Sequence, residues 1–214
     1  MNPTKEELSI MKENKKEILE ILKKQSKKPR KYENLVVNLA LQKLNTDKFE
    51  FDGKMVFNAD KTILIYVVAN DEAITVPDTV KVIGQMAFMQ HQKLKEITIP
   101  ASVEKIDKEA FAECDNLAKV VIPASVKGVY GFAFSECDRL KEVVFEGVPE
   151  HLGKNSFIGC EQLHTFRVPN GSAQVFRKAL HIIDDPDILV IEKDDPIEKK
   201  RQEEKSEEGK NKKH

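Results

Sequence analysis

Three cysteines and one histidine are the residues of this chain whose type and spacing could do chemistry. Cys114, Cys137 and Cys160 follow one another at intervals of 23 residues, and His91 stands 23 residues before Cys114. Thiolates and imidazoles bind soft metals such as zinc, and paired thiols can form a disulfide. A tetrahedral site needs ligands that converge, whereas a constant spacing in stacked repeats would set these four side chains in a row. Because three is an odd number for disulfides and free cysteine is usually buried, we interpret the row as core packing, with no metal or cofactor.

The other histidines do not indicate a catalytic centre. His151, His164, His181 and His214 lack the nearby Ser, Cys or carboxylate pattern of a nucleophile and base pair. There is no glycine-rich phosphate loop and no paired-ligand zinc motif. The acidic run at 184–187 lacks the glycine and distal glutamate of a calcium loop and therefore predicts a turn. We expect no catalytic residues and a protein that is not an enzyme.

The spacing of the cysteines extends to apolar residues and so defines the elements that would position them. Four phenylalanines and four leucines recur with the same interval: Phe88, Phe111, Phe134 and Phe157, and Leu94, Leu117, Leu140 and Leu163. A period of about 20–29 residues carrying Leu-x-x-Ile-x-Ile is typical of a leucine-rich repeat, in which stacked coils share one core. The pattern predicts a solenoid.

One coil shows the expected local structure. Leu94, Ile97 and Ile99 fall on one side of an extended segment, and Glu96 and Thr98 fall on the other, which predicts a strand that ends at a proline. The next segment, 102–114, has apolar residues three and four apart, which predicts a short helical turn on the outer wall. Its expected inward residues are Val103, Ile106, Ala110, Phe111 and Cys114.

Two segments, 76–88 and 99–114, resemble the BspA-type, or Treponema-type, leucine-rich repeat. The resemblance covers roughly residues 54–180; 52–65 is similar to the divergent first coil of that family, and 168–172 is similar to its last. It implies an α/β fold, a right-handed horseshoe with a parallel sheet on the concave face and short helical or 3-10 turns on the convex face. It also implies a binding role, often as a surface-exposed or secreted microbial adhesin.

The chain divides into three predicted parts. Residues 1–46 are expected to form an N-terminal helical cap, and residues 192–214 a disordered charged tail. The solenoid spans 47–191, with a first coil at about 47–73, repeats at about 74–168 and a C-terminal cap at about 169–191.

The predicted caps have helix signals. Thr4 and Glu7 form a capping box for a helix running to about Lys24. Residues 32–44 keep helical spacing, although part of that stretch also alternates as a strand would; we favour helix. Near the other end, Ser172 is expected to cap a short helix through Ala179, in which Val175, Phe176, Ala179 and Leu180 cover the last coil, followed by a closing strand at 188–191.

Charge gives little information about partners. The net charge is −1 with 33% charged residues, so the whole protein presents no field that favours nucleic acid or membranes. The basic run 23–31 is the one candidate for such binding. It contains no aromatic residue to stack on bases, so we do not expect nucleic-acid binding.

The first residues lack the apolar core of a signal peptide, and no stretch is apolar enough to span a bilayer. We therefore expect a cytoplasmic protein, with a cell-surface or secreted one, exported by an unrecognised route, as the alternative. We expect a monomer; a dimer formed through the N-terminal helix is the alternative.

Outward positions on successive strands form two columns that we take as the candidate binding face. Beyond Ala73, which begins the first column, its residues are Glu96, Lys119, Glu142 and Thr165 in that column and Thr75, Thr98, Val121, Val144 and Arg167 in the second. The first column alternates in charge and is expected to form a ladder of surface ion pairs. The second carries an apolar strip with a cation at one end, which β-propensity alone would also explain.

The predicted function is a non-catalytic protein–protein interaction module. Five strands offer about 200–300 Å² on this face, against roughly 800 Å² per partner in a standard interface. A protein partner would therefore contact further parts of the chain, whereas a peptide could use the sheet alone. The alternatives are an adhesin of the same fold and a weak nucleic-acid or anionic-surface binder that uses the basic run.

Overall fold

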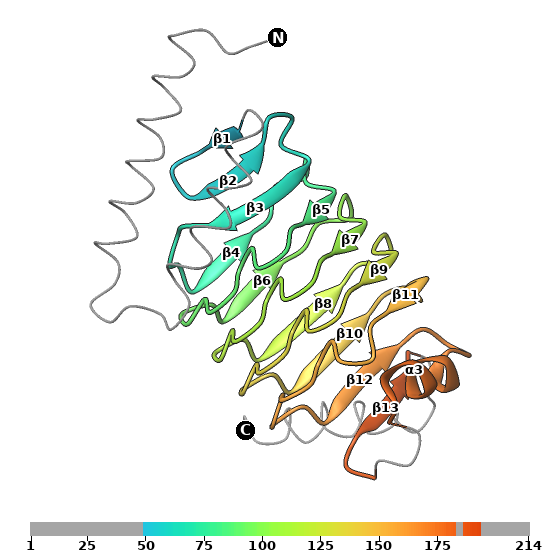
Figure 1. The fold of residues 1–214 in the computed structure, drawn as a ribbon. Helices are drawn as coiled ribbons and strands as arrows, with labels where there is room; N and C mark the ends of the chain where they lie inside the picture. Colours follow the sequence, from blue (N-terminus) through green and yellow to red (C-terminus); the bar gives the residue numbers. More distant parts are fainter. Residues whose placement is uncertain (1–48, 183–185, 194–214) are drawn as a thin grey trace, which may run out of the picture.

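The computed structural model describes residues 49–182 and 186–193, which form a β-solenoid of stacked coils (Figure 1). The predicted N-terminal helices, the basic run and the charged tail after residue 193 lie outside the described residues. The described part contains two faces of strands and little helix, so the α/β assignment is corrected to a β-solenoid with parallel sheets.

Each coil contributes one longer and one shorter strand. The long-strand face consists of β4 (Ala73–Thr75), β6 (Glu96–Thr98), β8 (Lys119–Ile122), β10 (Glu142–Phe145), β12 (Thr165–Val168) and β13 (Leu189–Glu192). The short-strand face consists of β1 (Phe49–Phe51), β2 (Met55–Asn58), β3 (Ile63–Val67), β5 (Val82–Ile83), β7 (Lys105–Ile106), β9 (Gly128–Val129) and β11 (His151–Leu152). The predicted parallel sheet is present, but its backbone ladder is interrupted: β4 and β6 form one pair, and β8, β10, β12 and β13 form a second sheet.

The outer wall differs from the predicted helical turns. The segment after β7 forms successive tight turns, with Glu109 and Glu113 in the left-handed region at φ 57° and 58°. The N–H of Ala110 bonds within the coil, to Asp107, at 3.3 Å, whereas the N–H of Phe111 bonds to Ala133 of the next coil at 2.7 Å. A helix would satisfy all of these groups within one coil; here alternate N–H groups join neighbouring coils instead.

The core is a stack of identical layers. Phe88, Phe111 and Phe134 are buried, and their rings stack with centroid distances of 4.6 and 4.9 Å. Phe157 continues the column at 5.3 Å from Phe134. The inward residues predicted for the coil at 102–114 are all buried in this core.

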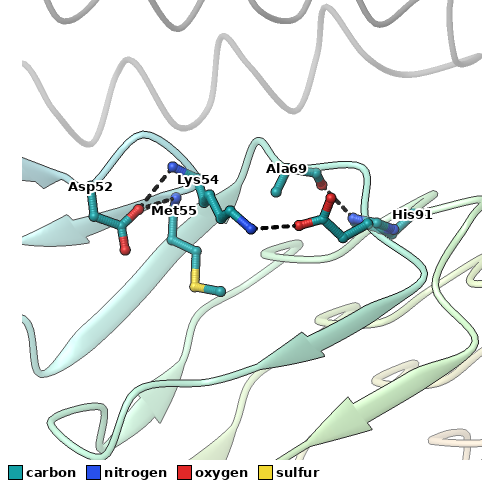
Figure 2. Close-up of polar contacts among 6 residues, drawn as sticks. Asp52, Lys54, Met55, Ala69 and His91 are labelled. Atoms are coloured by element: carbon teal, nitrogen blue, oxygen red, sulfur yellow. Dashed lines mark hydrogen bonds and ion pairs between the residues drawn. The ribbon is translucent and has the colours of Figure 1, made fainter.

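An antiparallel meander of β1, β2 and β3 begins the described solenoid. Figure 2 shows the polar contacts beside it: the Asp52 carboxylate accepts the N–H groups of Lys54 and Met55 at 2.9 and 2.7 Å. The Lys54 ammonium reaches Asp71 at 2.9 Å. These contacts fix the turn between β1 and β2 against the start of the next coil.

The C-terminal helix α3 (Ala173–Leu180) lies where the sequence predicted it, but its capping differs. The Ser172 hydroxyl donates to the Pro169 carbonyl, while the Glu192 carboxylate accepts the N–H of Ala173 at 3.0 Å. Phe176 and Leu180 cover the core as predicted. Val175 instead faces solvent, with 54% exposure, because it lies on the opposite side of the helix.

Candidate interaction surface

The residues of the two predicted columns are brought into register on the long-strand face. Glu142 pairs with Lys119 on one side and with Thr165 on the other, and Val144 lies between Val121 and Arg167 in the same way. The pairs Ala73–Glu96 and Thr75–Thr98 continue the columns on β4 and β6. Parallel in-register pairing places equivalent residues on one face because side chains alternate along each strand.

Ion pairing on this face centres on Glu142. Its carboxylate lies 2.9 Å from the Lys119 ammonium and 3.1 Å from the Arg167 guanidinium, so a residue of the second column crosses to the first. The expected pair between Glu96 and Lys119 is not among the ion pairs of residues 49–182 and 186–193, where the backbone ladder also breaks between β6 and β8.

The electrostatics of Glu142 follow from these neighbours. Partial burial raises the pKa of its carboxyl group, but the hydrogen bond and charge of Lys119, together with the charge of Arg167, outweigh burial. The net result is a pKa below the ordinary value, so this carboxylate stays ionised and holds both cations near it. Its charge is satisfied within the face.

Thr165 corrects the predicted site. It is 6% exposed, and its hydroxyl hydrogen-bonds with the Nδ1 atom of His164 at 2.8 Å. The sequence placed it on the outward side, but strands β10 and β13 flank it in register through Glu142 and Leu189, which cover this short side chain. Thr165 is therefore part of the packing and not of the exposed face.

An apolar strip runs along the second column. Val121 is 38% exposed and Val144 is half-buried beside it. The structure adds two residues that the sequence analysis left out: Leu189, which is 51% exposed, and Ile191, because β13 pairs with β12 and extends both columns by one strand. The predicted closing strand at 188–191 carried this signal, but its alternation was not joined to the columns.

The histidine and cysteine row lies in the core. Cys114 and Cys137 are buried, Cys160 is half-buried, and all three are free thiols. Each thiol donates to the carbonyl of a phenylalanine one coil earlier, Cys114 to Phe88 at 3.2 Å being the first. His91 is also buried, and its Nε2 donates to the carbonyl of Ala69 (Figure 2), since a carbonyl can only accept.

Among the described residues, no group of three or more His, Cys, Asp or Glu side chains is arranged to hold a metal ion. Within the same residues, no helix has the length and apolar content needed to cross a bilayer. The described chemistry of the molecule is thus that of a packed core and a patterned surface.

Comparison with solved structures finds leucine-rich repeat proteins of bacteria. One from Eubacterium ventriosum is 22% identical, with 69% of this chain covering 40% of that one at a TM-score of 0.55. One from Bacteroides ovatus is 21% identical, with 56% of this chain covering 30% of that one at a TM-score of 0.48. The T. pallidum leucine-rich repeat protein is 20% identical, with 57% of this chain covering 69% of that one at a TM-score of 0.43. The chain thus spans well under half of the first two relatives.

No curated protein matches the chain. A family model described as the BspA type leucine rich repeat region matches residues 66–181 in six copies, which is more than half of the chain. The matched residues are those of the parallel coils and of the α3 cap. The chain therefore belongs to the BspA-type leucine-rich repeat family.

Proposed function

We propose that this chain is a non-catalytic protein-interaction module whose binding surface is the long-strand face. The observation that supports this proposal is the exposed apolar strip of Val121 and Val144, which lies beside the ion-paired Glu142. Exposed aliphatic side chains next to fixed charges give a partner both apolar area to bury and a polar rim to orient it.

The size of the face limits the partner. The long-strand face is smaller than the roughly 800 Å² that each partner buries in a standard interface. A peptide or a protruding loop with aliphatic side chains matches the strip in size and chemistry. The residues added by β13, Leu189 and Ile191, lengthen the apolar surface available to such a partner.

The test is affinity capture with the full chain from a lysate of the source cells, followed by measurement of affinity for each partner identified. The variant carries Val121→Arg and Val144→Arg. The matched control is Ile63→Arg, which makes the same change at an exposed position, 39% accessible, on the short-strand face. We expect the double variant to lose partners that the control retains; equal capture by both would show that the long-strand face does not bind.

The family role as a surface protein motivates the second location for the same function. We propose a cytoplasmic site of action, with an adhesin at the cell surface as the alternative. The same capture is therefore repeated with the envelope fraction and with extracellular proteins. Partners found only in the extracellular set would replace the cytoplasmic proposal with the adhesin, and the double variant would still be expected to lose them.

A further inference from the structure

The two faces of the solenoid end differently at the C-terminal side. On the long-strand face, β13 pairs with β12 and closes the sheet. On the short-strand face, β11 is the last strand; it pairs with β9 on one side, and no strand of the described residues pairs with its other side. Figure 1 shows β11 at the edge of its face, while β13 and α3 lie at the end of the other.

The open edge continues a regular ladder. The N–H of Asp107 donates to Ile83 at 2.9 Å, that of Tyr130 to Ile106 at 3.0 Å, and that of Gly153 to Val129 at 2.9 Å. The N–H of His151 likewise donates back to the coil of β9, to Lys127, at 3.0 Å. Because N–H groups alternate in direction along a strand, the N–H of Leu152 faces away from β9, toward the place of a following strand.

A hollow lies beside this edge. It has a volume of about 260 Å³ and is lined by apolar side chains of β11, its preceding loop and α3, among them Val148, Leu152, Val175 and Phe176. Val148 is 49% exposed and Val175 is 54% exposed. Leu152 is only half-buried, whereas its equivalent in the preceding coil, Val129, is fully buried by the coil that follows it.

We propose that the outer edge of β11 is a docking site for an extended segment of a partner protein. The segment pairs parallel to β11, accepts from the N–H of Leu152 and places one aliphatic side chain in the hollow. The occupant follows from continuity with the coil-to-coil interface, since Ile83, Ile106 and Val129 fill this layer in the preceding coils. The proposal rests on the interaction function proposed above but uses a different surface.

The probe is an N-acetylated, C-amidated peptide that copies residues 123–130, the segment that supplies β9. The readout is hydrogen exchange of the Leu152 amide in the full chain. We expect about 1 mM peptide to slow this exchange by about tenfold or more, which is the effect of a bound fraction of about nine-tenths or greater. Unchanged exchange at this concentration would overturn the proposal.

Two α3 variants test the hollow. Val175→Asp places a charge in it, and Gln174→Asp places the same charge on the adjacent exposed position of the same helix. Both changes add an acidic residue to the first turn, which is compatible with the helix dipole, so both should fold. We expect about tenfold weaker peptide binding for Val175→Asp and none of this loss for Gln174→Asp; equal binding by both would overturn the docking geometry.

Two further outcomes are decisive. If light scattering without peptide shows a dimer and the Leu152 amide is already protected, the edge is occupied by a second copy and the partner proposal is overturned. The Val121→Arg, Val144→Arg variant should bind the peptide as the unaltered chain does. Failure of the long-strand face in its own test would therefore leave this edge intact, and the reverse also holds.

Discussion

At the residue scale, the repeated thiols act as short donors that tie one coil to the previous one. The Cys160 thiol beside it and burial together raise the pKa of Cys137 well above the ordinary value of a thiol. A thiol that keeps its proton donates a hydrogen bond and is a poor nucleophile. The row therefore strengthens coil stacking and does not supply reactive groups.

Phe111→Ala should strongly lower the free energy of unfolding. The Phe111 ring is fully buried between Phe88 and Phe134, so truncation leaves a cavity that neighbouring coils cannot close. We expect a loss of about 3–5 kcal/mol in urea unfolding. The control, Phe132→Ala, removes a ring that is 42% exposed and should cost about 1 kcal/mol or less. Similar losses in both variants would contradict the layered core.

Glu142→Gln should change how stability depends on pH. Because the folded-state pKa of Glu142 is lowered, its contribution is present above its ordinary pKa of 4.5 and is lost as pH falls through the lowered value. The unaltered chain should therefore have the higher Tm above this range, and the difference in Tm should shrink toward acid. Thermal unfolding at a series of pH values measures this; a difference in Tm that is constant across the series would contradict the pairing with Lys119 and Arg167.

At the element scale, the short strands and tight turns are held by bonds between coils more than by bonds within them. Two-residue strands such as β5 and β7 would not be stable alone, but each is paired on both sides. This explains why non-glycine residues such as Glu109 occupy the left-handed region: the neighbouring coils fix the backbone there and offset the strain.

Gly84→Ala should disturb the contact between β3 and β5. A Cβ atom at Gly84 would lie 2.6 Å from the Leu64 carbonyl oxygen, which is backbone and cannot turn aside. We expect a loss of about 1–3 kcal/mol, as for overpacking. Gly131→Ala is the matched control, because nothing lies within 4 Å of its Cβ position. Equal Tm values for the two variants would show that the strands separate at no cost.

The sequence predicted the repeat, the strand alternation and the inward residues because each depends on the local period of 2 or of 23. It failed where structure depends on contacts between coils. The alternate bonding of Ala110 and Phe111 replaced the expected helical turn, and the neighbours of Thr165 buried a residue whose parity pointed outward. Leu189 was missed because its place in the column depends on how β13 pairs with β12.

At the scale of the whole molecule, stacking makes each coil depend on its neighbours. β9 pairs only with β7 and β11 on its face, and β13 pairs only with β12. In such a stack, stability is close to a sum of terms for coils and for the interfaces between them. The ends should therefore open before the middle, and the C-terminal end should depend on α3 and β13.

Phe176→Ala tests this dependence. The Phe176 ring is 1% exposed and lies 4.7 Å from that of Phe145, so it joins α3 to the last core layers. Its loss should weaken the cap without disturbing layers that it does not contact. We expect native-state hydrogen exchange to speed up in β12 and β13, while amides of β5 and β7 keep their protection. A uniform loss of protection across all strands would instead show that the solenoid unfolds as one cooperative unit, in which a change at one end is transmitted through every coil.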